Sequence, residues 1–333
     1  MIEFKDVTKR YPDGTVAVNG LSLQAPSNKI TVFVGPSGCG KTTSLRMINR
    51  TIDRTAGVIS IDGRDINDGD PVALRRGIGY VIQHAGLFPH RTVLDNVATV
   101  PRLLGWDRAK TRTVAMELLE RVGLDPKLAK RYPAQLSGGQ QQRVGVARAL
   151  AADPPIMLMD EPFSAVDPIV RHSLQEEFLR LQREIGKTIV FVTHDIDEAI
   201  KLGDYVAVLK VGGTLAQFAP PAELLASPAD PFVESFVGQD RGYRALTFLK
   251  VGDLELGPLP NELVRDDSGR PTGWRNGSGS VQSIGAVFRR GDSLRAALDA
   301  VLTSPVGQGV CVDSEGKAVG IVDHSMLAGV LNP

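Results

Sequence analysis

Three short runs of apolar residues stand out along the chain, at residues 30–34, 156–159 and 188–192. Uninterrupted runs of this length are typical of strands whose two faces are both covered by helices. Longer segments with helical periodicity lie between them, for example residues 107–122, which are followed by Gly123. The pattern from Met1 to about Phe236 therefore predicts an α/β fold with a largely parallel sheet.

A polar stretch with helical periodicity, from about residue 89 to residue 150, interrupts the strands. We interpret it as a helical subdomain inserted into the α/β domain. The pattern loosens after Pro228, where glycine, proline and serine become frequent. The sequence therefore predicts two domains, residues 1–239 and residues 240–333.

Within the second domain, the spacing Asp-x-x-Gly-x-x-x-Gly begins at Asp266 and recurs at Asp313. We interpret the recurrence as two copies of one small unit. Two unrelated strand-turn-strand hairpins remain the alternative. The second copy is preceded by a clear helical pattern at residues 294–302, and the first copy lacks one. We therefore expect a small α+β domain whose first unit has degenerated.

Composition narrows the class of protein. Hydrophobic residues make up 42% of the chain and charged residues 23%, as in folded globular proteins. Lys plus Arg and Asp plus Glu both total 38, so no net basic charge attracts nucleic acid, which we do not expect as a partner. The chain begins without the apolar core of a signal peptide, and its two cysteines, Cys39 and Cys311, are too few for a disulfide framework. These features favour the cytoplasm.

A glycine-rich motif follows the first apolar run directly. It matches G-x-x-x-x-G-K-[ST] and consists of Gly35, Pro36, Ser37, Gly38, Cys39, Gly40, Lys41 and Thr42. The glycines let backbone N–H groups point inward around a phosphate, and a helix beginning at Lys41 adds the positive end of its dipole. Lys41 can reach the β- and γ-phosphates, and the hydroxyl of Thr42 can ligate Mg²⁺. The motif therefore predicts a nucleoside triphosphate site.

Two adjacent carboxylates, Asp160 and Glu161, end the second apolar run. A parallel strand would bring Asp160 beside the phosphate loop, where a Mg²⁺ ligand belongs. Glu161 is the candidate general base that polarises the attacking water. Acidic residues also end many strands without any function, so this prediction depends on the phosphate loop.

A further motif decides the family. It consists of Leu136, Ser137, Gly138, Gly139 and Gln140, and Arg143 follows it. With the phosphate loop and the Asp-Glu strand end in this order, residues 1–236 resemble the ABC ATPases. The resemblance implies a P-loop nucleotide-binding domain with a helical subdomain. It also implies an ATPase coupled to transport, with ATP and Mg²⁺ as cofactors.

The resemblance implies roles for further positions. Tyr11 matches the aromatic residue that stacks on adenine, and Thr43 belongs to the ATP site beside Thr42. Gln83 matches the glutamine that contacts Mg²⁺ and water, and His194 matches the histidine that contacts the γ-phosphate. The implied Mg²⁺ ligands are Thr42, Gln83 and Asp160. The implied catalytic residues are Lys41, Glu161 and His194.

The resemblance also implies that the chain works with a second copy of itself. ATP held by one copy then faces residues of the other copy, so that two nucleotides are sandwiched between two chains. Bound ATP favours the closed pair, and hydrolysis removes the γ-phosphate contacts that hold it closed. The residues implied to act across the interface are Ser137, Gly138, Gly139, Gln140 and Asp167.

Two stretches narrow the kind of transporter. Residues 41–50 and 79–93 resemble the branch that imports quaternary-amine osmoprotectants such as glycine betaine, carnitine and choline. The resemblance implies integral membrane permease subunits as partners, an extracytoplasmic solute-binding protein acting through them, and a position at the cytoplasmic face of the membrane. Residues 291–323 resemble a cystathionine-β-synthase-type (CBS) module, which members of that branch often carry.

Two alternatives remain open at this point. The chain could serve an importer of another small solute, such as an amino acid or phosphate. It could also be a soluble ABC ATPase that acts on a macromolecule. The interval from Gln83 to Leu136 is too short for the long coiled coil of chromosome-maintenance relatives, and one cassette disfavours the twin-cassette translation factors.

Overall fold

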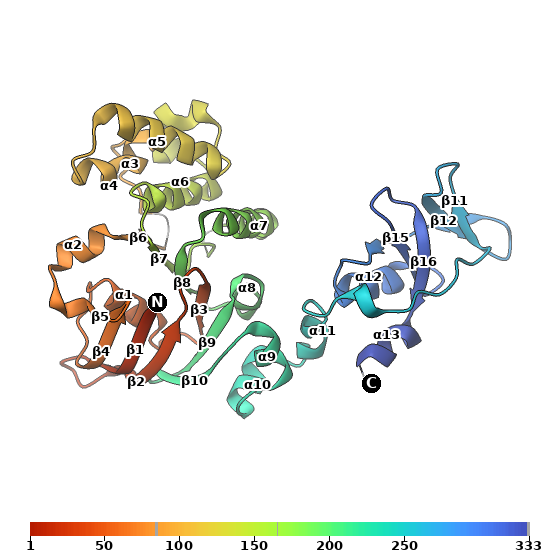
Figure 1. Ribbon diagram of the computed structural model, residues 1–333, viewed down its shortest axis with the longest axis horizontal. Coiled ribbons are helices and arrows are strands. Elements are labelled where there is room, and N and C mark those ends of the chain that lie inside the picture. Colours follow the sequence, from red (N-terminus) through yellow and green to blue (C-terminus); the bar gives the residue numbers. More distant parts are fainter. Residues whose placement is uncertain (84–85, 165, 332–333) are drawn as a thin grey trace. The chain divides into compact units, whose positions relative to one another are not determined.

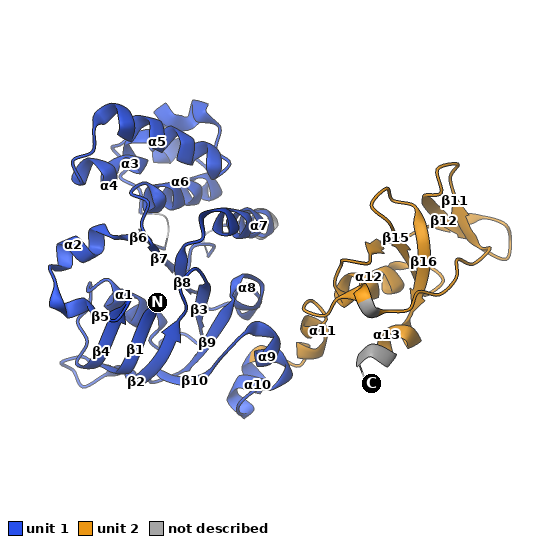
Figure 2. Ribbon diagram, viewed as in Figure 1, with its two compact units in different colours: residues 1–236 blue, residues 237–333 orange. Residues whose placement is uncertain are grey.

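The computed structural model describes residues 1–83, 86–164 and 166–331. The chain divides into two compact units, Met1–Phe236 and Val237–Pro333 (Figure 2); the sequence predicts the boundary after residue 239. His84, Ala85 and Ala165, which belong to stretches discussed above, lie outside the described residues. Among the residues described, no helix has both the length and the apolar character that a membrane crossing needs.

A six-stranded sheet lies at the centre of the first unit, in the order β10-β9-β3-β8-β7-β6 (Figure 1). Its strands are β3 (Ile30–Val34), β6 (Ile78–Val81), β7 (Ile156–Asp160), β8 (Thr188–Val192), β9 (Tyr205–Lys210) and β10 (Thr214–Ala219). The strands from β9 to β6 are parallel, and β10 pairs antiparallel with β9. All residues of β3, β7 and β8 are buried, as the apolar runs predict. The predicted α/β fold is confirmed.

A second, four-stranded antiparallel sheet was not predicted. Its order is β2-β1-β4-β5, and its strands are β1 (Ile2–Arg10), β2 (Val16–Ala25), β4 (Ala56–Ile61) and β5 (Arg64–Asp65). Buried and exposed positions alternate along these strands, because only one face is covered. Ile2 and Phe4 belong to the same hydrophobic core as Phe33 of β3, and the rings of Phe4 and Phe33 meet edge to face at 6.0 Å. The two sheets therefore enclose one core.

Helices make up the rest of the first unit. The helical subdomain contains α3 (Val93–Val97), α4 (Thr99–Leu103), α5 (Arg108–Arg121) and α6 (Gly138–Leu150), with 3₁₀ turns at Pro126–Lys130 and Pro133–Gln135. The other helices are α1 (Lys41–Ile48), a 3₁₀ turn at Ile66–Asp68, α2 (Pro71–Arg76), α7 (Pro168–Ile185), α8 (Ile196–Leu202), α9 (Pro221–Ala226) and α10 (Pro231–Val237). Helix α5 begins where the carboxylate of Asp107 accepts the N–H groups of Ala109 and Lys110. It ends before Gly123, whose φ is +69°.

The second unit contains two three-stranded sheets, β11-β12-β13 and β14-β15-β16. In chain order its elements are α11 (Arg241–Ala245), a 3₁₀ turn at Val251–Asp253, β11 (Leu263–Arg265), β12 (Pro271–Arg275), β13 (Val281–Ser283), β14 (Val287–Arg289), α12 (Leu294–Thr303), β15 (Gln308–Val312), β16 (Ala318–Asp323) and α13 (His324–Leu331). The helix expected at residues 294–302 is therefore α12. The described part of residues 246–286 contains no α-helix.

The recurring spacing in this unit corresponds to two hairpin turns of one geometry. Asp266 Oδ1 accepts N–H groups from Ser268 and Arg270, and Asp313 Oδ1 accepts those two and four residues further on. The glycine that follows each turn has a φ of +82°. The two hairpins are β11-β12 and β15-β16, and they touch, because the N–H of Ala318 donates to the carbonyl of Gly269 at 3.1 Å.

Candidate functional site

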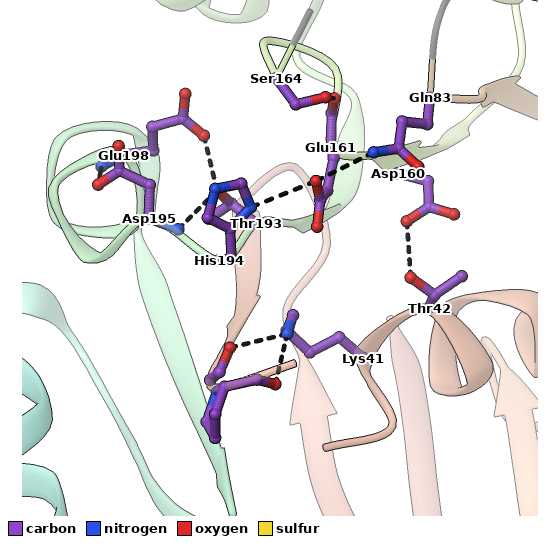
Figure 3. A network of polar contacts seen from close by, with 12 residues as sticks. Lys41, Thr42, Gln83, Asp160, Glu161, Ser164, Thr193, His194, Asp195 and Glu198 are labelled. Carbon is purple, nitrogen blue, oxygen red and sulfur yellow. Dashed lines mark hydrogen bonds and ion pairs between the residues drawn. The ribbon is translucent and has the colours of Figure 1, made fainter. Parts of the chain in front are cut away.

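Four neighbouring strands end beside one another, and each is followed by a residue predicted to bind or hydrolyse ATP. The phosphate loop follows β3, His194 follows β8, Glu161 follows β7 and Gln83 follows β6. Because the carboxyl ends of parallel strands share one edge of the sheet, the order β3-β8-β7-β6 puts these residues in a row (Figure 3). Residues far apart in the sequence are thereby brought together.

The phosphate loop winds tightly around the amino group of Lys41. Gly40, with a φ of +90°, permits this, since a Cβ atom there would lie 2.1 Å from the carbonyl oxygen of Ala17. Lys41 Nζ donates to the carbonyl oxygens of Gly35 and Pro36 at 2.7 and 2.9 Å, and the residue is only 6% exposed. Its positive charge is therefore held inside the loop, where phosphate oxygens would be stronger acceptors than carbonyls. The remaining predicted members, Ser37, Gly38, Cys39 and Thr43, lie in the loop or in the first turn of α1.

The side chains of Thr42, in the first turn of α1, and Asp160, at the end of β7, contact each other. The hydroxyl of Thr42 donates to Asp160 Oδ1 at 2.9 Å. Arg46, one turn further along α1, has its Nη2 3.7 Å from Asp160 Oδ2, and the sequence analysis did not identify this residue. Burial raises the pKa of Asp160, while the hydroxyl of Thr42 and the charge of Arg46 oppose that shift. A second cation at this carboxylate would therefore favour its charged form.

Glu161 is held in an unusual backbone conformation at the end of β7. Its φ is +45°, and its N–H donates to the carbonyl of Val192 on β8 at 2.9 Å. Its Oε2 atom accepts from Gln83 Nε2 at 3.2 Å and lies 3.2 Å from His194 Nδ1. Ser164 donates its hydroxyl to the Glu161 carbonyl at 2.9 Å. A left-handed conformation is costly for a residue with a side chain, so this one is maintained by its surroundings.

The predicted trans-acting residues lie apart from this row, in the helical subdomain and before α7. Ser137 caps α6: its hydroxyl accepts the N–H of Gln140 at 3.3 Å, and Gln140 Oε1 accepts the N–H of Ser137 at 2.9 Å. Ser137 and Gly138 are exposed, Gly139 is half-buried, and Asp167 is exposed.

Two arginines outside the predicted set hold α6 in place. Arg143 Nη1 donates to the carbonyl of Val122 at the end of α5 at 2.8 Å and lies 2.5 Å from Glu177 of α7. Arg148 Nη1 donates to the carbonyl of Gly86 at 2.7 Å. The sequence shows only that Arg143 follows the motif. Neither contact could be read from spacing, since each joins α6 to a segment that is distant in the sequence.

Tyr11 lies in the antiparallel sheet region, directly after β1. Its N–H donates to the carbonyl of Thr15 at 2.9 Å, and the ammonium group of Lys9 lies 5.1 Å from the centre of its ring. The residue is half-buried. Val16, which begins β2, precedes Ala17, the residue that Gly40 approaches.

Comparison with known proteins settles the family. The family described as ABC transporter matches residues 18–164. The osmoprotectant import ATP-binding protein of Salmonella typhimurium is 43% identical, over 100% of this chain and 96% of that relative. This chain belongs to the ATP-binding proteins of ABC transporters. Proteins of this family are ATPases coupled to solute import.

Other ABC proteins are similar over the first unit. The choline transport ATP-binding protein of Bacillus subtilis is 55% identical, over 72% of this chain and 63% of that relative. A dimeric ATP-binding cassette, solved in a post-hydrolysis state with ADP and Pi bound, is 37% identical with a TM-score of 0.60. That match covers 66% of this chain and 99% of the cassette.

Proposed function

We propose that this chain hydrolyses Mg-ATP at the carboxyl edge of its parallel sheet and thereby drives the import of quaternary-amine osmoprotectants. The observation that carries the chemistry is the convergence on Glu161 Oε2, which accepts from Gln83 and lies within 3.2 Å of His194 Nδ1. A carboxylate with one amide and one imidazole beside it is well placed to orient a water molecule for attack on a phosphate.

The side chains near Thr42 fit magnesium. Mg²⁺ prefers oxygen ligands and is usually held by one or two protein groups together with phosphate oxygens. The Thr42 hydroxyl and Asp160 carboxylate supply two oxygens 2.9 Å apart, and Gln83 can supply an amide oxygen. No group of three or more His, Cys, Asp or Glu residues in the described chain could hold a metal, which agrees with a site that needs the nucleotide. Bound there, the ion would neutralise charge on the β- and γ-phosphates.

The chain's own residues divide the remaining work. Lys41 would leave the loop carbonyls for the phosphate oxygens and stabilise the charge that develops on them. Glu161 would accept a proton from the attacking water, with Gln83 holding its carboxylate in place. His194 would donate a hydrogen bond to the γ-phosphate. Because these groups are already in position, the reaction would be catalysed mainly by orientation of the reactants and by stabilisation of charge on the phosphate.

We further propose that two copies close around two nucleotides. The start of α6 is exposed, and its first N–H groups and the Ser137 side chain form an anion site of the kind found at helix N-termini. Asp167 would lie at the same interface. The dimeric state of the solved cassette supports this arrangement. The test is the mass in solution of the Glu161→Gln variant with Mg-ATP: a dimer is expected, and a monomer at every nucleotide concentration would refute the sandwich.

The solute is proposed from the names of the relatives alone. The names of the Salmonella and Bacillus relatives refer to osmoprotectant import and choline transport. We propose permease subunits, with a solute-binding protein outside the membrane, as partners, and the cytoplasmic face as the location. Uptake of labelled glycine betaine, choline and carnitine should fall when the gene is deleted. Unchanged uptake of all three would leave another solute as the alternative.

For the second unit we propose one CBS-like module, β14-α12-β15-β16-α13, preceded by a degenerate partner. The order of elements supports it, and the partner retains the hairpin β11-β12 with its Asp266 turn, extended by β13. We propose a packing or dimerisation role in preference to nucleotide sensing, because the first module lacks its helices. Equilibrium dialysis with ATP and AMP on a chain carrying Lys41→Ala tests this, and binding that persists in that variant would contradict it.

A further inference from the structure

Glu198, in the first turn of α8, is a buried acid to which the proposed mechanism gives no role. It is 6% exposed. Its Oε2 accepts the hydroxyl of Thr193 at 2.7 Å, and its Oε1 accepts Nε2 of Gln175 on α7 at 3.2 Å. One carboxylate thus joins the end of β8, the start of α8 and the middle of α7. Figure 3 shows its contact with Thr193.

These contacts enclose the residue proposed to meet the γ-phosphate. The Thr193 hydroxyl that donates to Glu198 also accepts the N–H of Asp195 at 3.0 Å. The residues on both sides of His194 are therefore tied to Glu198. On the strand side, the N–H of Thr193 donates to the carbonyl of Phe33 at 3.1 Å. The imidazole of His194 lies 3.2 Å from Glu161 Oε2 through its Nδ1, and the backbone that presents it is fixed by the neighbouring residues Thr193 and Asp195.

A carboxylate is an expensive choice for a buried site that only needs filling. Burial raises the pKa of Glu198, and the nearby negative charge of Asp195 acts in the same direction. The positive charge of Arg171 on α7, with the bonds from Thr193 and Gln175, opposes this. An apolar side chain would pack α8 against α7 without that cost. An apolar side chain could not, however, accept the hydrogen bonds from Thr193 and Gln175.

Through Gln175, Glu198 is also connected with the segment around Asp167, which is proposed to lie at the interface between two copies. Helix α7 follows Asp167, and Arg171 Nη2 donates to the carbonyl of Val166 at 3.1 Å. One turn later, Gln175 donates to Glu198. Helix α7 therefore contacts the backbone beside Asp167 through Arg171, and the turn that carries His194 through Gln175 and Glu198.

We propose that Glu198 is a positioning residue for His194: its two carboxylate oxygens fix the turn that presents the imidazole and tie that turn to the helix that follows Asp167. The inference rests on the proposed function, which gives His194 its contact with the γ-phosphate. Glu198 touches no reacting atom. Its loss should therefore lower kcat for ATP hydrolysis and leave nucleotide binding nearly unchanged.

The test measures ATP turnover and ATP binding of the purified full chain in several variants. Glu198→Ala removes both acceptors, and we expect kcat to fall about 10- to 100-fold, with KM for ATP within about twofold of wild type. Glu198→Gln keeps an acceptor for Thr193 and lets Gln175 turn its amide to pair with it. We expect this variant to retain at least about half of the wild-type kcat.

The matched control is Glu176→Ala. Glu176 is also on α7 and pairs with Lys201 of α8 at 2.9 Å, so it bridges the same two helices without reaching His194. Its removal should leave kcat unchanged. If Glu198→Ala does not fold, Thr193→Val replaces it, because the valine keeps the shape of the side chain and removes the hydroxyl that links Glu198 to Asp195.

A double-mutant cycle with His194→Ala separates positioning from a general structural effect. If Glu198 acts through His194, Glu198→Ala or Thr193→Val should cost almost nothing further once the imidazole is gone. Equal costs with and without His194 would overturn the proposal, as would wild-type kcat in a folded Glu198→Ala chain or a Glu198→Gln chain as slow as Glu198→Ala. A wild-type chain that does not hydrolyse ATP would instead count against the proposed function.

Discussion

Nδ1 of His194 lies 3.2 Å from Oε2 of Glu161, although the two residues end different strands. Strands β7 and β8 are paired in register, with Asp160 opposite Val192, so the residue after Asp160 meets the turn that follows β8. The contact is therefore a direct result of sheet register. Shifting either strand by one residue would turn one of the two side chains away.

Replacing Glu161 tests the proposed base. Glu161→Gln keeps the size of the side chain and its contact with Gln83, so ATP binding should persist. Turnover should fall about 100- to 10,000-fold, the usual contribution of a general base. Measured by phosphate release and ATP titration, unchanged hydrolysis would show that another group activates the water.

Removing the amino group of Lys41 should impair ATP binding as well as turnover. Lys41→Ala deletes the charge held within the phosphate loop, so we expect weaker ATP binding together with turnover reduced about 100-fold or more. Lys29→Ala is a suitable control, since that surface lysine pairs with Asp204 away from the site. Equal effects in both variants would contradict a specific role for Lys41.

The residues proposed to be catalytic all lie in the first unit. A chain ending at Gly238 should fold and hydrolyse ATP at a rate close to that of the full chain, since its hydrophobic core belongs to residues before Phe236. The measurement is turnover per folded molecule, with circular dichroism as the check of folding. A folded but inactive truncation would mean that the second unit contributes to the ATP site.

The second unit should be sensitive at Trp274. This side chain is 1% exposed and packs against Leu263, Val310 and Ile321. Trp274→Ala should lower the free energy of unfolding of this unit by about 3–5 kcal/mol. Thermal melts should show the loss in one of two transitions, while ATP turnover stays the same. A simultaneous fall of both transitions would mean that the units unfold together.

Stability should depend on pH through Glu198. Its pKa in the folded chain is raised above the ordinary 4.5, chiefly by burial, so folding favours the protonated form. The resulting loss of stability is absent below pH 4.5 and grows as pH rises towards the raised value. Glu198→Gln cannot ionise. The free energy of unfolding of this variant, measured with urea, should increase relative to that of wild type as pH rises above 4.5. A difference between the two that does not change with pH would contradict the raised pKa of Glu198.

The central sheet could be predicted because burial on both faces leaves uninterrupted apolar runs, and these became β3, β7 and β8. The antiparallel sheet was missed because its strands are covered on one face, and because the pairing of β1 with β2 shifts register at several points after Phe4. Sequence motifs correctly predicted which strand or helix end holds each residue at the sheet edge, namely Lys41, Thr42, Gln83, Asp160, Glu161 and His194. Arg46 and Glu198 could not be identified, since an arginine or glutamate in a helical turn reveals nothing of which side chains it will face.

Helix α6 begins at the exposed Ser137 cap and ends with Arg148 bound to the carbonyl of Gly86. Its 13 residues form a rod about 20 Å long. The contact with Gly86 and the exposed Ser137 cap therefore lie near opposite ends of one stiff helix. In the proposed assembly, a displacement of Gly86 by a permease subunit would shift the Ser137 end of α6 and with it the proposed contact to the nucleotide bound by the second copy.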